Sequence, residues 1–308
     1  MFRFIPQKRR SALRVKLGVA FYCMLRRFAW IRWHRRFAVL KDSFSSPDSL
    51  LKEFPFTAFE HSVPLRRNLS DADTALQEGK IANLQIALKK ISGIKLETGK
   101  IFSYWRLIGK PSAKKGYQKG MMLVNGHPTA AVGGGLCALS NLIYWMTLHT
   151  QLTVIERYRH SYDVFPDSNR TQPFGSGATC VYNYRDLMIK NNTADTYALV
   201  IWIDEEKGLL CGKWLKDSPV TDKYEVYQKE HWISSEIGGV YVRHNTIWRR
   251  HFMLSGKTES SLNASDTEQK KLAGDEYVTE NHAIMMYEPL LETFSCDGNQ
   301  NGEKPDGN

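Results

Sequence analysis

Two segments of the chain show apolar residues at the spacing of an α-helix. The first covers residues 72–92, and Gly93 follows it as a stop signal. The second, residues 136–150, is apolar almost throughout and comes directly after three consecutive glycines. We therefore expect an amphipathic helix over 72–92 and a core helix over 136–150. The apolar positions that define the first helix are Leu76, Ile81, Leu84, Leu88 and Ile91.

Short apolar or alternating segments predict strands along much of the remaining chain. Turn residues separate several of them, and the pair Asn125-Gly126 is a good hairpin signal. The order of a helix, short strands, a central apolar helix and further strands indicates an α+β fold. In this fold the central helix, with Cys137 at its N-terminus, packs on a mainly antiparallel sheet. The predicted strands are 94–96, 101–107, 121–124, 152–157, 178–184, 187–190, 197–203 and 208–215, with a further short pair within 238–253.

Composition divides the chain into five segments. Residues 255–274 are rich in Ser, Thr, Asn, Glu and Lys, which is typical of a linker, and the last residues contain no apolar side chain. The predicted segments are a basic N-terminal segment (1–41), a folded domain (42–254), a polar linker (255–274), a short C-terminal element (275–296) and a disordered tail (297–308).

Positive charge is concentrated at the N-terminus. Residues 1–41 hold twelve Lys or Arg and no Asp or Glu, so this segment carries +12, whereas the whole chain carries +10 and the remainder −2. The apolar run in this segment, residues 17–25, covers about half of the ~20 residues needed to cross a bilayer. Arg26 and Arg27 follow it directly without a small-residue cleavage pattern, which argues against a signal peptide.

Three interpretations of the basic segment are open. Aromatic residues interleaved with arginine favour a helix that lies on an anionic membrane surface. The segment could instead pack on the folded domain or on another protein. Nucleic-acid binding has no recognised motif to support it, and we expect no such partner. We expect a location in the cytoplasm or at the inner face of the membrane, with export as the open alternative. The aromatic residues are Phe28, Trp30, Trp33 and Phe37.

The cysteines do not form a disulfide framework or a zinc site. No two of them have CxxC spacing, and their odd number leaves at least one free thiol. No cluster of His and Cys has the spacing of a structural zinc site, so we predict no metal and no cofactor. The five are Cys23, Cys137, Cys180, Cys211 and Cys296.

The segment around Cys137 is the most specific local feature. Three glycines permit positive φ and close backbone approach, and they lead into the helix, which places Cys137 in its first turn. Helix N-termini lower the pKa of cysteine, and a thiolate with access to substrate is a nucleophile. His160, just after the strand 152–157, is the candidate base. Its orienting partner stays open between Asp163, Asp186 and Asn183.

A structural role competes with this interpretation. A free cysteine usually behaves as a small buried apolar residue, and a lone histidine is more often structural than catalytic. The triple glycine and the position at a helix start favour the catalytic interpretation of Cys137. Cys180 and Cys211 fall within predicted strands, and we expect both in the core.

A series of motifs between residues 75 and 215 resembles the VanW family. Gly99 to Trp105 is similar to the family's "GExFSFW" segment, and Gly116-Tyr117 and Asn125-Gly126 match its glycine-tyrosine and "NG" positions. The three glycines with Cys137 and Ser140-Asn141 are similar to "GGGxCQxSN", and Glu156-Arg157 with His160-Ser161 to "ERxxHS". Residues 177–193 are similar to "DATxxxxxDLxxxN". Ala138 stands where the family has Gln, and Gly177 where it often has Asp.

The resemblance implies a role in glycopeptide resistance and cell-wall metabolism. Secreted members of the family resemble L,D-transpeptidases, in which a cysteine takes an acyl group from a peptide stem and passes it to an amine. Carried over here, Cys137 forms the thioester, His160 moves protons and Asp186 completes the catalytic group, with a peptidoglycan peptide or precursor as partner. The resemblance places Gly134, Gly135, Ser140 and Ser161 at the substrate or its oxyanion.

Two functions of different classes are therefore open. The first is a cysteine-dependent acyl transferase or amidase, which the presence of Cys137 and His160 favours. The second is a non-catalytic, membrane-associated accessory protein of wall metabolism or resistance, which Ala138 and the lack of a clear export signal favour. We favour the enzyme.

Overall fold

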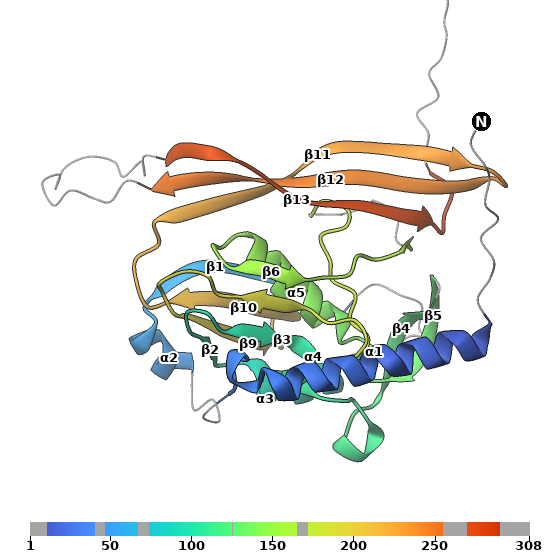
Figure 1. The fold of residues 1–308 in the computed structure, drawn as a ribbon, viewed down its shortest axis with the longest axis horizontal. Coiled ribbons are helices and arrows are strands. Elements are labelled where there is room, and N and C mark those ends of the chain that lie inside the picture. The colour runs from blue at the N-terminus through green and yellow to red at the C-terminus, as the bar shows by residue number, and fades with distance from the viewer. Residues whose placement is uncertain are drawn as a thin grey trace, which may run out of the picture.

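The computed structural model describes residues 11–40, 47–66, 74–124, 126–164, 172–254 and 270–289. The fold is α+β with mainly antiparallel sheets, as the sequence predicts. Figure 1 shows a body of helices and short strands, with a long twisted sheet along one side and the helix α1 (Ala12–Arg32) along the other. No helix among the described residues is long and apolar enough to cross a membrane.

A four-stranded antiparallel sheet forms the centre of the body. An apolar layer covers each of its faces. Successive side chains of the strand β9 (Tyr197–Asp204) point alternately into one layer and the other. Leu199 and Ile201 belong to the main core with the helices α3 (Thr74–Ile91) and α5 (Cys137–Leu148), whereas Ala198 and Val200 pack with residues of the short helix α2 (Pro47–Glu53). The strand order is β1 (Phe56–Pro64), β10 (Leu209–Lys216), β9 (Tyr197–Asp204) and β2 (Ile94–Leu96).

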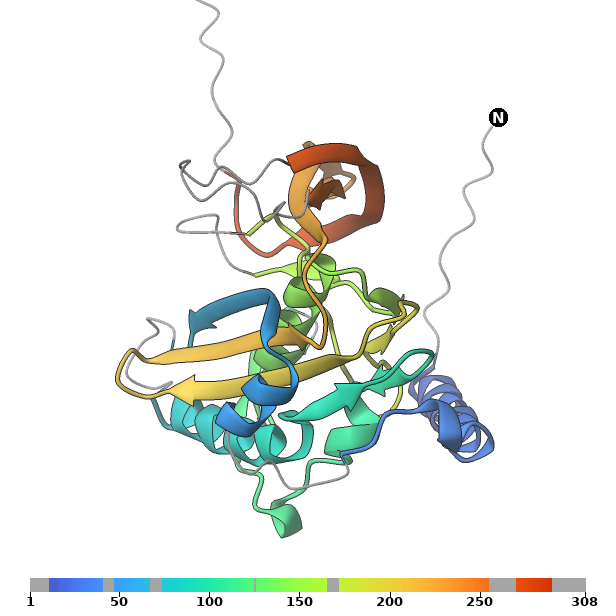
Figure 2. The same ribbon diagram turned by 90° about the vertical axis from the view of Figure 1, so that its left-hand side faces the viewer.

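Two helices pack against this sheet. The helix α5 (Cys137–Leu148) packs on β1 and β10, and α3 (Thr74–Ile91) packs on β9. Figure 2 shows α5 running across the sheet. Both helices lie within a few residues of their predicted bounds, because their apolar positions follow the helical period.

Smaller elements surround the helices. A three-stranded sheet has the order β3 (Ile101–Ser103), β8 (Met188–Lys190) and β6 (Thr153–Glu156), and β4 (Lys119–Val124) forms a hairpin with β5 (His127–Val132). The chain turns between Val124 and His127, where the sequence predicts a turn at Asn125-Gly126; Asn125 lies outside the described residues. Single turns of 3₁₀-helix occur at His34–Arg36 and Ala113–Lys115.

Two predicted strands take another form. The segment 101–107 is a strand only up to Ser103 and continues as the helix α4 (Tyr104–Ile108), because Ser103 caps the helix with its hydroxyl. The segment 178–184 is a loop with a single bridge between Val181 and Arg185. Its backbone runs beside the helix α5 instead of joining a sheet.

The long sheet is larger than the short strand pair expected within 238–253. The strands β11 (Asp222–Glu236) and β12 (Val240–Leu254) form a hairpin, β13 (Lys270–Met285) pairs with β12, and β7 (Tyr162–Asp163) pairs with β13. Residues 270–274, expected in the linker, are therefore part of a strand, as are residues 275–285 of the expected C-terminal element. Most of β13 is exposed or half-buried, so its composition is polar although its backbone is paired.

Asp186 holds α4 to the strand β8. Its carboxylate accepts hydrogen bonds from the Ser103 hydroxyl at 2.6 Å, from the Trp105 backbone N–H at 2.9 Å and from the Leu187 N–H at 2.9 Å. The side chain is fully buried. Burial raises the pKa of Asp186 from its ordinary value of 3.8 to about 6, although the bonds from Ser103 and Trp105 act in the opposite direction.

The raised pKa of Asp186 predicts a contribution to the free energy of unfolding that decreases as pH rises. The folded state holds the Asp186 proton more tightly than the unfolded state, so the contribution of this group is full below pH ~4 and is lost as pH rises through about 6. In Asp186→Asn, the difference in the free energy of unfolding between pH 4 and pH 7 should shrink by up to about 3 kcal/mol. Urea denaturation across this pH range measures it.

The half-buried Asp204 provides the control. A backbone hydrogen bond from Lys207 lowers the pKa of Asp204. Asp204→Asn should therefore not reduce the decrease in the free energy of unfolding between pH 4 and pH 7. An Asp186→Asn variant with the pH dependence of the wild type would contradict the assignment.

Candidate functional site

Close backbone packing fixes the three glycines before α5. A Cβ on Gly134 would lie 2.0 Å from the Gly120 carbonyl oxygen, and one on Gly135 would lie 2.3 Å from Lys80 Cγ. Gly135 also has φ +90°, a conformation that favours glycine. The carbonyl of Leu136, the residue before the helix, accepts a hydrogen bond from the Tyr104 hydroxyl at 2.8 Å. The glycines therefore bring the start of α5 directly onto β4 and α3.

Cys137 is the first residue of α5, as predicted, and it is half-buried. Burial raises the pKa of the Cys137 thiol, and a hydrogen bond from the Cys180 backbone acts in the opposite direction. The net shift is opposite to the lowering expected from a helix N-terminus alone. Nearby first-turn donors are already engaged, since the N–H groups of Ala138 and Leu139 bond to the carbonyls of Gly135 and Leu136 at 3.0 and 3.1 Å. The resting thiol is therefore protonated at neutral pH.

His160 lies beside α5 and is held from both ring nitrogens. Nδ1 is 2.8 Å from the Thr179 hydroxyl, and Nε2 is 3.4 Å from Asn141 Oδ1. Asn141 follows Cys137 by four residues, so the two share one face of α5. Asn141 Oδ1 also accepts the Ala178 N–H at 2.8 Å. One amide side chain thus joins the face that carries Cys137, the imidazole of His160 and the loop before Cys180.

Arg157 anchors that loop. Its guanidinium donates to the carbonyl of Gly177 at 2.9 Å and to the carbonyl of Gly175. The same group donates to the Thr279 hydroxyl at 3.1 Å and to Asn281 Oδ1 at 3.0 Å, both on β13. Four acceptors from two parts of the chain therefore fix the loop against the long sheet.

The Gly177 position shows why glycine replaces the family's aspartate. A Cβ on Gly177 would lie 2.7 Å from His160 Nε2 and 2.8 Å from Asn141 Oδ1. A side chain at this position would force the ends of His160 and Asn141 to shift, and with glycine the loop packs directly on the His160 ring. The other departure, Ala138, is half-buried and packs against the main core.

The three residues considered as partners of His160 have other contacts. Asp186 holds α4, as described above. Asp163 is buried, accepts the Tyr287 hydroxyl at 2.8 Å and lies 3.4 Å from Arg243. Asn183 is buried and donates to the Cys23 carbonyl of α1 at 3.3 Å. Their described hydrogen bonds hold α4, the long sheet and α1 to the body.

The four residues expected at the substrate are divided between two regions. Gly134 and Gly135 form the entry to α5, and Ser140 is fully buried with its hydroxyl donating to the Ala178 carbonyl at 2.8 Å. Ser161 is exposed, and its carbonyl accepts the Ile284 N–H of β13 at 3.1 Å. Ser140 thus supports the loop from within the core.

Sequence reasoning missed Asn141, Thr179 and the role of the Cys180 backbone. Asn141 could have been found from its spacing, because a polar residue four positions after Cys137 lies on the same helix face. Thr179 and Cys180 gave no such signal, because a loop places them and no repeating pattern marks a loop. Cys180 is buried, as predicted, and so is Cys211.

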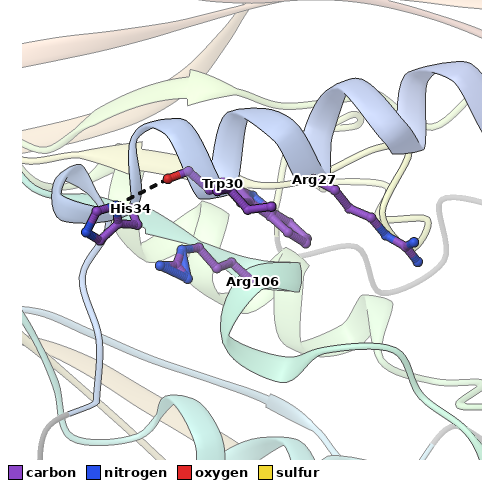
Figure 3. Close-up of a pocket in the computed structure, with 5 residues that line it drawn as sticks. Arg27, Trp30, His34 and Arg106 are labelled. Carbon is purple, nitrogen blue, oxygen red and sulfur yellow. Dashed lines mark hydrogen bonds between the residues drawn. The ribbon is translucent and has the colours of Figure 1, made fainter.

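A separate pocket lies between α1 and α4. It has a volume of about 450 Å³ and is lined by Arg27, Trp30, Ile31, His34 and Arg106 (Figure 3). Among the described residues, no group of three or more His, Cys, Asp or Glu side chains could hold a metal ion.

Comparisons with known proteins agree with the sequence motifs. The family described as "VanW like protein" matches residues 79–213. Vancomycin B-type resistance protein VanW of Enterococcus faecalis (strain ATCC 700802 / V583) is 33% identical over 190 residues, which cover 62% of this chain and 68% of that protein. Uncharacterized protein YoaR of Bacillus subtilis (strain 168) is 27% identical over 82 residues, about a quarter of each chain. No solved structure matches.

The agreement extends over the elements that build the site. The matched region begins within α3 and ends within β10, and it includes Cys137, Asn141, His160 and Thr179. The identity to the Enterococcus protein covers more than two thirds of that protein. The chain therefore belongs to the VanW family.

Proposed function

We propose that this protein is a cysteine-dependent acyl transferase or amidase that acts on peptidoglycan peptides or their precursors. One observation carries the proposal: His160 is held by Thr179 and Asn141 beside the helix face on which Cys137 lies. A histidine held beside the helix face that carries a cysteine is compatible with a base that serves a thiol nucleophile, and this supports the proposal. The name of the Enterococcus relative supports the choice of a cell-wall substrate.

The raised pKa of Cys137 determines how such a reaction begins. Because the resting thiol is protonated, a base must take its proton as sulfur attacks the carbonyl carbon of the donor peptide. His160 accepts this proton. The tetrahedral intermediate then collapses to a thioester on Cys137, and the leaving amine takes the proton from His160.

The second half of the reaction restores the thiol. An acceptor amine, or water for an amidase, attacks the thioester carbon and gives a proton to His160. The new amide or acid leaves, and the proton returns to the sulfur of Cys137. The positive end of the α5 dipole favours the negative charge that develops on the carbonyl oxygen in both halves. Ala138 offers no side-chain donor for this charge.

A second candidate function rests on the burial of Cys137. A thiol whose pKa is raised is not activated in the resting protein, and this favours a non-catalytic accessory protein of wall metabolism or resistance. In this alternative, Cys137 and His160 stabilise the start of α5 and the loop that packs on it.

Replacement of Cys137 distinguishes the two functions. The wild type, incubated with peptidoglycan tetrapeptide fragments, should release an amine product and carry an acyl adduct on the peptide that contains Cys137. Cys137→Ala should lose the adduct and reduce turnover at least ~100-fold. Mass spectrometry of protein and products measures both effects. The matched control is Cys211→Ala, a buried cysteine in β10, which should keep turnover. Absence of both product and adduct in the wild type as well as in Cys137→Ala would support the accessory function.

The base is tested by the pH profile of turnover. His160→Gln keeps a hydrogen-bonding side chain but cannot move a proton, so kcat should fall about 10²–10⁴-fold. The variant should also lose the pH-dependent rise of the wild type at acidic to neutral pH, because histidine changes charge in this range. Thr179→Val, which removes the Nδ1 contact but leaves the imidazole, should give a smaller loss and keep that rise. A normal profile in His160→Gln would remove His160 from the mechanism.

A further inference from the structure

The helix α1 is fixed to the body along one side. Arg26 forms a two-fold ion pair with Glu156 at 2.5 Å, and both side chains are largely buried. The Asn183 amide donates to the Cys23 carbonyl at 3.3 Å, and Trp30 packs against the main core. These contacts come from one face of the helix, since Cys23, Arg26 and Trp30 recur at steps of three and four residues. The orientation of α1 is therefore set.

The opposite side of α1 carries an exposed apolar stripe. Its members follow one another at steps of three and four residues along the whole helix, and each is more than half exposed. Figures 1 and 2 show α1 at the edge of the molecule, with its outer side facing away from the sheets. The stripe consists of Leu13 (67%), Leu17 (62%), Phe21 (52%), Met24 (58%), Phe28 (65%) and Ile31 (74%). Six large exposed apolar side chains on one surface indicate a binding surface.

The charges that border the stripe are all positive. The helix contains Arg14, Lys16, Arg27 and Arg32 besides the paired Arg26, and it contains no acidic residue. Arg35 and Arg36 follow it, together with the exposed Trp33. Apolar and aromatic residues flanked by arginine are typical of a helix that lies in the interface of an anionic membrane.

The pocket at the C-terminal end of α1 adds positive charge beside this surface. The indole Nε1 of Trp30 and the Nε of Arg106 are buried and lack a hydrogen-bond partner among the described residues. Arg27 and His34 lie at the same pocket, as Figure 3 shows. Because these two donor atoms are buried, the pocket meets a lipid headgroup through the positive charges of Arg27 and Arg106, which fit its phosphate.

Charge also argues against a second copy of the chain on the same surface. Two α1 helices packed through their stripes would bring their arginines together without any carboxylate between them, because α1 contains none. A leaflet with acidic headgroups supplies both the apolar interior and the negative charge. We propose that the outer face of α1 docks this protein on the surface of an acidic phospholipid membrane.

Vesicle binding by the full chain tests the proposal independently of any enzymatic activity. The wild type should sediment with vesicles of phosphatidylcholine mixed with phosphatidylglycerol, and much less with phosphatidylcholine alone. High salt should weaken the binding, because it screens the arginines. Leu17→Ser, Phe21→Ser and Phe28→Ser combined should reduce the apparent affinity roughly tenfold or more, with unchanged charge.

Two controls separate the stripe from general effects. Ile237→Ser combined with Leu272→Ser removes exposed apolar residues of the long sheet and should leave vesicle binding unchanged. The unfolding temperature of the stripe variant should match that of the wild type, because its three residues are exposed.

Three outcomes would overturn the proposal. The first is equal binding of the wild type to both kinds of vesicle. The second is unchanged binding of the stripe variant. The third is a wild type that is dimeric in analytical ultracentrifugation and becomes monomeric in the stripe variant without loss of vesicle binding, which would make the stripe an interface between copies.

Discussion

The site depends on the way Asn83 holds the entry to α5. This side chain on α3 is fully buried and makes three hydrogen bonds to backbone groups, to the N–H and carbonyl of Gln118 at 2.8 and 3.0 Å and to the carbonyl of Gly134 at 2.9 Å. A buried amide left without these partners would be costly, so the bonds specify one arrangement of helix, hairpin and glycine loop. The contact between Gly120 and Gly134 is possible only in this arrangement. The position of Cys137 follows from it.

The sequence predicted those parts of the fold that have a repeating pattern. The helical period gave α3 and α5, alternation gave β9 and β10, and the triple glycine placed Cys137 at a helix start. The strand expected after Gly99 ends early, because Ser103 and Asp186 stabilise a helix there through contacts across distant parts of the chain. The long sheet was underestimated, since most of β13 is exposed or half-buried and its first residues, 270–274, resemble a linker in composition.

Of the residues in the candidate site, the sequence singled out Cys137 and His160. Both stand out by residue type, whereas the contact of His160 with Asn141 on α5 is decided by tertiary packing. Asp186 was the expected third residue, and its oxygens cap α4 instead. The direction of the thiol pKa was expected from the helix terminus alone, whereas burial outweighs that effect. Desolvation depends on neighbours that no local pattern reveals.

The anchoring of the site loop by Arg157 bears on where the functional unit of this family ends. The matched family region stops at residue 213, whereas two of the acceptors of Arg157, Thr279 and Asn281, lie on β13. A chain cut after the family region would leave a buried guanidinium short of two partners and the loop around Gly177 held from one side only. The matched family region is thus narrower than the set of elements that hold this loop, because the long sheet supplies two of the four acceptors of Arg157.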